Sequence, residues 1–256
     1  MISPLLKHDL QFLANAGWIV GIDEAGRGAL AGPVVAAAVV LQEAFYNSVW
    51  CQQRAMGVND SKQLSPSKRE ALYSQMTQLR DRGEISYAVG IASVSEIEKL
   101  NIFGATKLAM QRALEKLEAV WGGGSFERHQ TDAPLFERSL RTDNFSGTAR
   151  VLVDGIPLKG FPFRHQAIVH GDGLSLAIAM ASIIAKVTRD RIMDGLDMKL
   201  PFYGFSENKG YATRRHRMAI KEVGASTDHR PSFLKKLLAG ESPMMEFVLN
   251  PEDKLS

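Results

Sequence analysis

The chain contains 256 residues, of which 45% are hydrophobic and 23% charged, and its formal net charge is +3. This length and composition predict a substantial buried core in one large domain, or in one domain with a smaller appendage. The net charge is too small to establish a polyanionic partner, and the single cysteine, Cys51, excludes an internal disulfide and argues against a thiol metal site.

The beginning of the chain does not resemble a secretory signal. Residues 1–8 lack a basic stretch followed by a long apolar run. No apolar stretch reaches the roughly 18 residues that a membrane span requires. We therefore expect a cytoplasmic protein that does not insert into a membrane.

Five short runs predict β-strands, at residues 18–22, 34–41, 85–91, 151–153 and 167–170. The segment between the first two strands is too short for a long helix, which predicts that the sheet starts with antiparallel strands. Strands alternate with helical runs in the second half, which predicts parallel additions to the same sheet. The fold class is therefore α/β.

Helical patterns occupy residues 67–81, 93–100, 106–120 and 175–198. Pro66 suits the start of the first helix, and Leu108, Leu114 and Leu117 show the spacing of an amphipathic helix in the third. Residues 200–256 contain no convincing strand and are expected to form helices and loops. We predict a main domain over residues 1–199, with a surface loop insertion at 121–150, and a helical C-terminal region over 200–256.

Basic residues are concentrated late in the chain. Residues 184–240 hold 12 Lys and Arg against 6 Asp and Glu, so the rest of the chain is net acidic. This separation fits a metal site beside a surface that grips nucleic acid. Ordinary solvated helix faces would give the same count.

Two adjacent carboxylates, Asp23 and Glu24, follow the first predicted strand, and a glycine-rich turn with Arg27 comes next. Carboxylates at the end of a buried strand are costly to desolvate unless a positive group meets them. A hard cation with oxygen ligands and a basic partner chain are both candidates. Gly26 and Gly28 allow the backbone to approach a ligand closely, and Arg27 can reach a phosphate.

Three more aspartates are candidates for the same site. Asp154 follows the fourth strand, and Asp172 lies between the fifth strand and a long helix. Carboxylates from separate strand ends are the ligand set of a two-metal phosphoryl-transfer site. Each also has a simpler interpretation: Asp154 as a turn residue before glycine, Asp172 as a helix N-cap, and Asp190 as the ion-pair partner of Lys186 four residues earlier.

An ordered series of motifs resembles the ribonuclease HII family, the type 2 ribonucleases H, over nearly the whole chain. The motifs lie at residues 21–28 with 32–33, 59–64, 101–106, 153–155, 171–172, 181–190, 209–216 and 229–233. The resemblance implies a ribonuclease H-like mixed five-stranded sheet flanked by helices, with a helical C-terminal extension. It also implies an endonuclease that hydrolyses the RNA strand of RNA–DNA hybrids and cuts 5′ of single ribonucleotides in duplex DNA, leaving 5′-phosphate and 3′-hydroxyl ends.

The resemblance also implies roles for particular residues. The metal-binding and catalytic acids would be Asp23, Glu24, Asp154 and Asp172, holding Mn²⁺ or Mg²⁺. The substrate would be contacted by Gly26, Arg27 and Gly28 at the ribonucleotide, by Lys62 at a phosphate, and by Tyr211 at the sugar of the next deoxynucleotide. We expect a monomer that binds RNA–DNA hybrids and ribonucleotide-containing duplexes, with no protein partner evident from a motif.

This chain departs from the family pattern in two places: Gln63 stands where the family often has a second lysine, and residues 121–150 form a longer stretch than usual. The spacing of His170, His216 and His229 does not indicate a zinc site, and we expect structural or phosphate-proximal roles for them. Two alternative functions remain open: another two-metal nuclease or transposase of this fold class, and a non-catalytic hybrid-binding protein.

The sequence gives a reason to prefer Asp172 over Asp190 as the fourth metal ligand. Asp172 precedes the long helix and can point into the site, where the helix N-terminus also favours negative charge. Asp190 lies inside the helix, roughly 22 Å from Ser175 at its start, given a rise of 1.5 Å per residue. We expect Asp190 to be a structural ion-pair residue.

Overall fold

The computed structural model describes residues 3–13, 16–54, 57–58, 64–129 and 149–238. Five strands form one mixed sheet in the order β3-β2-β1-β4-β5. Their bounds are β1 (Trp18–Ala25), β2 (Val34–Gln42), β3 (Ser86–Ala92), β4 (Ala149–Asp154) and β5 (Gln166–Ile168). Strands β1, β2 and β3 are antiparallel neighbours, whereas β4 and β5 add in parallel beside β1, which confirms the predicted α/β sheet.

Strand β1 is longer than predicted, because it continues through Asp23 and Glu24 to Ala25. The antiparallel ladder with β2 keeps these residues in the strand: Asp23 pairs with Ala37, and Ala25 pairs with Val35. The two carboxylates therefore lie inside a hydrogen-bonded strand, and not in the turn after it.

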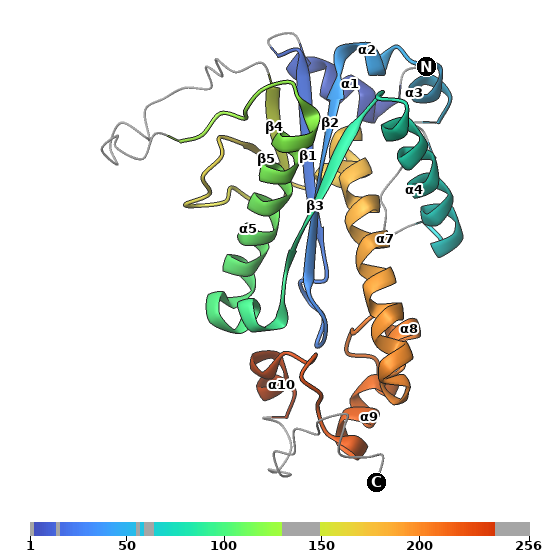
Figure 1. Cartoon of the computed structure of the whole chain (residues 1–256), viewed down its shortest axis with the longest axis vertical. Coiled ribbons are helices and arrows are strands. Elements are labelled where there is room, and N and C mark those ends of the chain that lie inside the picture. Colours follow the sequence, from blue (N-terminus) through green and yellow to red (C-terminus); the bar gives the residue numbers. More distant parts are fainter. Residues whose placement is uncertain (1–2, 14–15, 55–56, 59–63, 130–148, 239–256) are drawn as a thin grey trace.

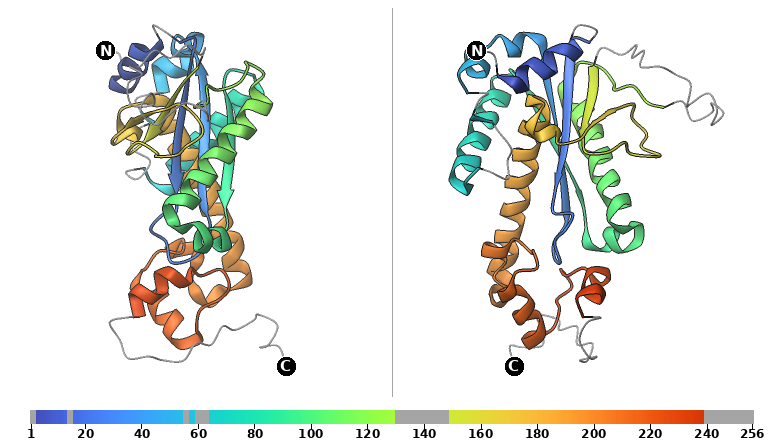
Figure 2. Two further views of the ribbon diagram at one scale, coloured as in Figure 1. Left: turned by 90° about the vertical axis from the view of Figure 1, so that its left-hand side faces the viewer. Right: turned by 180° about the vertical axis from the view of Figure 1, so that it is seen from behind.

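The sheet is covered by one long helix on each face (Figures 1 and 2). Helix α7 (Leu176–Lys199) packs on the face that carries Ile19 and Leu152, and α5 (Val94–Trp121) packs on the face that carries Ile22 and Val153. Because successive strand residues point to opposite faces, Asp23 faces α7, and Glu24 faces the side of α5.

Side-chain caps account for where the long helices begin. Ser65 caps α4 (Pro66–Asp81), Ser93 and Glu96 form a capping box at the start of α5, and Ser175 caps α7. The predicted helices at 93–100 and 106–120 are the two parts of α5. They meet at Asn101, whose backbone is non-helical (φ 57°, ψ 175°) and whose side chain accepts hydrogen bonds from the Phe103 and Gly104 amides.

Short helices lie at the two ends of the sheet. Three of them, which the sequence patterns did not predict, are α1 (Pro4–Leu13), α2 (Glu43–Tyr46) and α3 (Val49–Arg54). At the other end lie α8 (Phe205–Asn208), α9 (Arg214–Val223) and α10 (Pro231–Leu238), with the 3-10 turn η3 (Pro201–Tyr203). No helix among the described residues is long and apolar enough to cross a membrane.

The C-terminal helices share a small core with the β1–β2 loop and the end of α7. Leu30 and Ala31 from the β1–β2 loop and Met193 from α7 pack with Tyr203, Phe205 and their neighbours. The predicted domain boundary at residue 199 therefore falls at the end of α7, and packing continues across it. Within the predicted 121–150 insertion, α5 ends at Trp121 and β4 begins at Ala149, while residues 130–148 lie outside the described residues.

Gly21 allows α7 to lie directly against β1. A Cβ atom at Gly21 would sit 2.1 Å from the carbonyl carbon of Ala177 and 2.3 Å from the amide nitrogen of Ile178, both backbone atoms that cannot rotate away. This close approach fixes the distance between Asp23 on β1 and the segment that precedes α7.

We predict that Gly21→Ala lowers the free energy of unfolding by about 3 kcal/mol, since the helix must move away from the strand. Gly195→Ala is the matched control, because Gly195 lies in α7 and an added Cβ there meets no atom within 4 Å. Denaturant unfolding of both variants measures the difference. An unchanged stability for Gly21→Ala would contradict the close contact.

Candidate metal centre and substrate-binding surface

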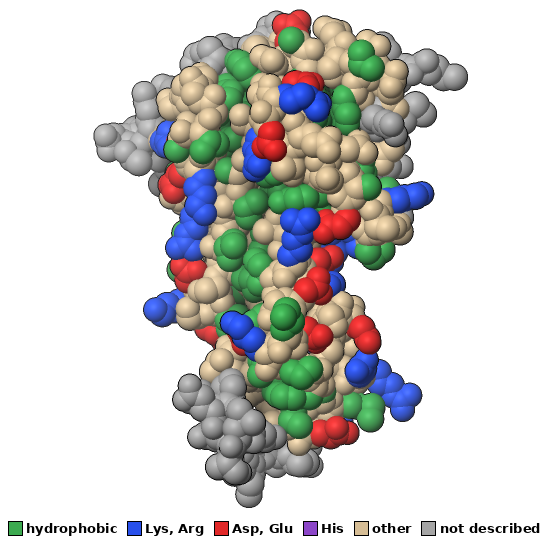
Figure 3. Space-filling model, turned by 45° about the vertical axis from the view of Figure 1, so that its right-hand side comes forward, with side chains coloured by type: hydrophobic (Ala, Val, Ile, Leu, Met, Phe, Trp, Pro, Cys, Tyr) green, Lys and Arg blue, Asp and Glu red, His purple; other side chains and the backbone are tan. Residues whose placement is uncertain are grey.

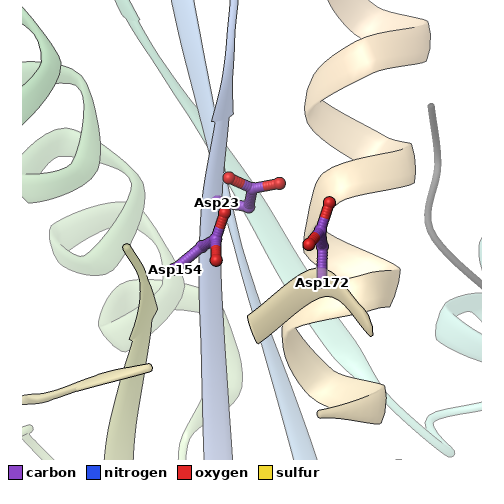
Figure 4. A group of neighbouring side chains, drawn as sticks. All are labelled: Asp23, Asp154 and Asp172. Atoms are coloured by element: carbon purple, nitrogen blue, oxygen red, sulfur yellow. The ribbon is translucent and has the colours of Figure 1, made fainter. Parts of the chain in front are cut away.

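Three aspartates converge at one point between the sheet and the start of α7. Asp23, Asp154 and Asp172 each offer a carboxylate oxygen, and these three oxygens all lie within 4.8 Å of one another. Figure 4 shows the three side chains pointing toward a common centre from β1, β4 and the turn before α7. Asp23 and Asp172 are buried, whereas Asp154 is partly exposed.

The parallel pairing of β1 and β4 brings the first two aspartates together. Ile22 is in register with Val153, so the next residues, Asp23 and Asp154, lie side by side. Strand β4 ends at Asp154 and leaves Glu24 on β1 without a strand neighbour on that side. The pairing of β1 with β4 therefore ends where the carboxylates gather.

Asp172 is positioned by the 3-10 turn η2 (Gly171–Gly173), which follows a left-handed residue, His170 (φ 57°). The Gly171 amide donates a 2.7 Å hydrogen bond to Asp154 Oδ1, and this bond ties the turn to the end of β4. The alternative interpretation of Asp172 as the N-cap of the long helix is wrong, because Ser175 performs that role by accepting from the Ile178 amide.

The electrostatics of the cluster favour a cation. Burial, followed by the charges of Glu24 and Asp154, raises the pKa of Asp23 well above its usual value, against hydrogen bonds from Ser182 and the Glu24 amide. Buried like charges disfavour ionisation unless a positive charge compensates them. Carboxylate oxygens at this spacing suit Mg²⁺ or Mn²⁺, so the donor set fits a divalent metal.

Glu24 is not part of the three-aspartate group. Its Oε1 accepts a 3.0 Å hydrogen bond from Arg27 Nη1, and the Arg27 guanidinium lies 5.4 Å from the centre of the exposed Phe103 ring on α5. Glu24, Arg27 and Phe103 therefore form a second cluster beside the aspartates. The predicted role of Glu24 as a metal ligand stays a prediction.

Two buried arginines hold the loop of residues 26–33, which joins β1 to β2. Arg189 from α7 donates to the carbonyl oxygens of Ala31 and Pro33, and Arg230 donates to those of Arg27, Gly32 and Pro33. Both guanidinium groups are removed from solvent, and burial together with the charge of Arg189 lowers the pKa of Arg230 to about 9. The loop carbonyls are thereby turned toward the protein interior.

Gly26 and Gly28 serve different purposes in this loop. Gly26 has a φ of +94°, and a Cβ there would meet the Arg189 side chain at 2.0 Å, so glycine is required for packing. A Cβ at Gly28 would meet no protein atom within 4 Å. Gly28 consequently leaves open space at the protein surface.

Tyr211 lies beside the same loop. The carbonyl oxygen of the preceding residue, Gly210, accepts hydrogen bonds from the Leu30 and Ala31 amides. The Tyr211 ring is 37% exposed and has the Arg189 guanidinium 5.4 Å and the Lys186 ammonium 5.8 Å from its centre. The structure therefore places Tyr211 and the Gly26–Gly28 turn in one surface region.

Lys62 and Asp190 are two other residues for which the sequence predicted a role. Lys62 lies outside the described residues. Asp190 is not a member of the three-aspartate group, and it pairs with Lys186 at 2.7 Å and with Arg69 at 4.0 Å, as an ion-pair residue should. The neighbouring Arg191 pairs with Glu70.

The basic surplus of residues 184–240 is not all surface charge. Arg189 and Arg230 are fully buried, and other members pair with acids, including Lys209 with Asp194 and Arg215 with Glu207. Figure 3 shows basic and acidic side chains interspersed on the face that it presents. The sequence count did not distinguish surface cations from buried ones, although both arginines fall within the motifs at 181–190 and 229–233.

We predict that Asp23→Asn stabilises the metal-free protein at neutral pH. The raised pKa means that the folded protein binds a proton on Asp23 more tightly than the unfolded chain does. The contribution of Asp23 to the free energy of unfolding therefore falls as pH rises above the ordinary aspartate range. Asparagine removes that charge and keeps an oxygen for the Glu24 amide. Thermal unfolding in EDTA as a function of pH tests this.

The same variant should respond less than the wild type to added Mg²⁺ or Mn²⁺, because a ligand has been lost. Asp190→Asn, measured alongside, should lose stability and keep the full response to metal. A lower melting temperature of metal-free Asp23→Asn than of wild type would contradict the assigned charge repulsion.

Comparison with known proteins identifies relatives over most of the chain. The family model described as ribonuclease HII matches residues 20–123 and 139–237. A ribonuclease HII of Desulfitobacterium hafniense is 42% identical over 233 residues, which cover 91% of this chain and 75% of the relative. A ribonuclease HII of Fusobacterium nucleatum is also 42% identical, over 94% of this chain and 95% of the relative.

Among solved structures, ribonuclease HII of Archaeoglobus fulgidus, determined as a complex with PCNA, superposes with a TM-score of 0.59 at 25% identity. The match covers 85% of this chain and 94% of that chain. Bst-RNase HIII, determined in complex with Mn²⁺, superposes with a TM-score of 0.60 at 18% identity, over 88% of this chain and 70% of that chain. The second likeness concerns the fold alone.

Proposed function

Because this chain belongs to the ribonuclease HII family of endonucleases, which cleave RNA in RNA–DNA hybrids, we propose that it also cuts 5′ of single ribonucleotides in duplex DNA. The observation that carries the proposal is the position of the three-aspartate group. Asp23 lies near the end of β1, which leads into the loop of residues 26–33, and that loop is hydrogen-bonded to the residue before Tyr211. A centre for hydrolysis and a surface for reading a sugar would thus lie on adjoining segments.

The proposed ligands for Mn²⁺ or Mg²⁺ are Asp23, Glu24, Asp154 and Asp172. Asp23, Asp154 and Asp172 are already convergent, and Glu24 follows Asp23 in β1. When two ions are bound, they would activate the attacking water and stabilise the leaving 3′ oxygen, giving 5′-phosphate and 3′-hydroxyl products. Release of Glu24 from Arg27 would free its carboxylate for the site and the guanidinium for a phosphate.

The proposed substrate contacts are Gly26, Arg27 and Gly28 at the ribonucleotide, Lys62 at a phosphate, and Tyr211 at the next sugar. The 2′-hydroxyl is the group that distinguishes one ribonucleotide within a DNA duplex. The open space at Gly28 supports a close backbone approach there, and the partly exposed Tyr211 ring supports stacking. This activity would serve ribonucleotide excision repair by a monomeric cytoplasmic enzyme.

The two alternative functions make different predictions. Another two-metal nuclease or a transposase of the same fold class would not require a ribonucleotide in its substrate. A non-catalytic hybrid-binding protein would bind the hybrid without cutting it. A nicking assay on duplexes with no ribonucleotide, one ribonucleotide or an all-RNA strand, in Mg²⁺, Mn²⁺ or EDTA, separates all three.

We predict that Asp172→Asn lowers the cleavage rate by roughly a thousandfold or more, because it removes a metal contact needed in the transition state. Its melting temperature in EDTA should be unchanged or slightly raised. Asp190→Asn is the matched control: it should lose stability because its ion pairs with Lys186 and Arg69 are removed, and it should retain measurable cleavage. The reverse behaviour of the two variants would place the metal site in the middle of α7.

We also predict that Tyr211→Ala impairs cleavage at a single ribonucleotide more than cleavage of a long hybrid, because only the former requires recognition of an RNA-to-DNA junction. The measurement is kcat/KM on both substrates, with the all-DNA duplex as a control that should stay intact. Equal losses on both substrates would reduce Tyr211 to a structural role.

Binding of the nucleic acid should weaken as salt rises, since phosphate contacts release counterions.

A further inference from the structure

Two buried histidines lie beneath Tyr211 and take no part in the proposed chemistry. His216 on α9 and His229 before α10 have their Nε2 atoms 3.0 Å apart, and both side chains are almost completely buried. The rings of Tyr203 and Phe205 pack against them, with centroids 4.6 Å from His229 and 5.3 Å from His216, respectively. Imidazoles in such a setting must satisfy their nitrogens with one another or with the backbone.

The backbone partners determine where each proton lies. The Ser226 amide is 3.0 Å and the Ser226 hydroxyl 2.9 Å from His229 Nδ1. Because the amide can only donate, this Nδ1 is the bare, accepting nitrogen, and the hydroxyl donates to it as well. The carbonyl oxygen of Tyr211 is 2.9 Å from His216 Nδ1, and because a carbonyl can only accept, this Nδ1 must carry the proton. In neutral rings, His229 Nε2–H therefore donates to His216 Nε2.

The result is a chain of hydrogen bonds with one direction. It runs from the Ser226 amide through His229 and His216 to the carbonyl oxygen of Tyr211. Burial lowers the pKa of both histidines, that of His229 to about 3 with a further contribution from His216, so both rings stay neutral near pH 7.

The histidine pair also connects the two segments that are proposed to read the substrate. His229 forms an isolated β-bridge with Ala31, and its neighbour Arg230 donates to the carbonyl of Arg27. His216 holds the Tyr211 carbonyl at the other end of the chain. The bond between the two imidazoles is thus one of the links between the Arg27 turn and Tyr211, beside the direct bonds from the Leu30 and Ala31 amides to the Gly210 carbonyl.

We propose that His216 and His229 are positioning residues that set Tyr211 relative to the loop of residues 26–33 and thereby determine selectivity for a single ribonucleotide over a continuous hybrid. The inference rests on the proposed function, since it needs Tyr211 to read the junction. The two histidines would act by holding the Tyr211 carbonyl through their hydrogen bonds, and neither would touch the substrate or the metal.

The first test measures the chain itself in the wild-type protein, independently of activity. ¹⁵N NMR of the imidazoles at neutral pH should show His216 protonated only on Nδ1 and His229 protonated only on Nε2. A scalar coupling should connect the two Nε2 atoms across their hydrogen bond. Protonation of His216 on Nε2, or of both nitrogens in either ring, would overturn the proposal.

The second test compares variants that keep or remove the donor to Tyr211. His216→Phe preserves a ring but removes the hydrogen bonds, whereas the side-chain amide of His216→Asn can replace the Nδ1 donor. The ratio of kcat/KM on the single-ribonucleotide duplex to that on the hybrid should fall about tenfold in His216→Phe, the effect of one lost hydrogen bond. His216→Asn should recover part of the ratio.

A double-mutant cycle separates failure of this inference from failure of the proposed function. If Tyr211→Ala lowers the ratio, His216→Phe should add no further loss in its presence. A normal ratio in His216→Phe beside a lowered ratio in Tyr211→Ala would overturn the role of the histidines alone.

A normal ratio in Tyr211→Ala would overturn the junction-reading role of Tyr211 and this inference with it. A failure of the wild type to cut any ribonucleotide-containing substrate would overturn the proposed function. If His216→Phe does not fold, His216→Asn and the NMR measurement still decide.

Discussion

The burial of Asp23 beside other carboxylates is the constraint on which the rest of this structure depends. Asp23 is buried next to Glu24 and close to Asp154, and its pKa is raised in consequence. Such a group persists only where the backbone leaves the side chains no room to separate. The ladder between β1 and β2, the bond from Gly171 to Asp154 and the close packing of α7 on Gly21 supply that restraint.

A second restraint acts on the loop that follows β1. Arg189 and Arg230 bring two positive charges into the interior, where they are held by carbonyl oxygens instead of carboxylates. Burying a cation is costly unless its donors are satisfied, and carbonyl oxygens turned inward satisfy them. The C-terminal region is therefore a structural requirement of the loop, because Arg230 comes from that region and Arg189 also donates to the Lys209 carbonyl.

Local sequence patterns were sufficient to predict the strands and the parallel additions to the sheet, because strand ends and helix starts are encoded locally. The same patterns made Asp23, Asp154 and Asp172 candidates for one site, but they left Asp154 as a turn residue and Asp172 as a helix N-cap equally open, and the family resemblance supplied the set of acids. The local patterns also separated Asp172 from Asp190, since the rise along a helix is fixed. The ribonuclease HII family was identified from the motif series and is confirmed by the comparisons. The extent of β1 past Ile22 was missed, because it depends on pairing with β2 across the sheet.

The role of the buried cations could not be predicted for a related reason. Arg189 sits next to Asp190 in a charged helical segment, and its contacts to Ala31 and Pro33 join residues more than 150 positions apart. A count of charges treats such a residue as surface, whereas the structure uses it as an internal brace. The same brace lies against Gly26 and beside the ring of Tyr211, so one guanidinium contacts both proposed substrate-reading elements. Selectivity in this fold would then depend on the rigidity of this buried polar layer as much as on the residues that reach the nucleic acid.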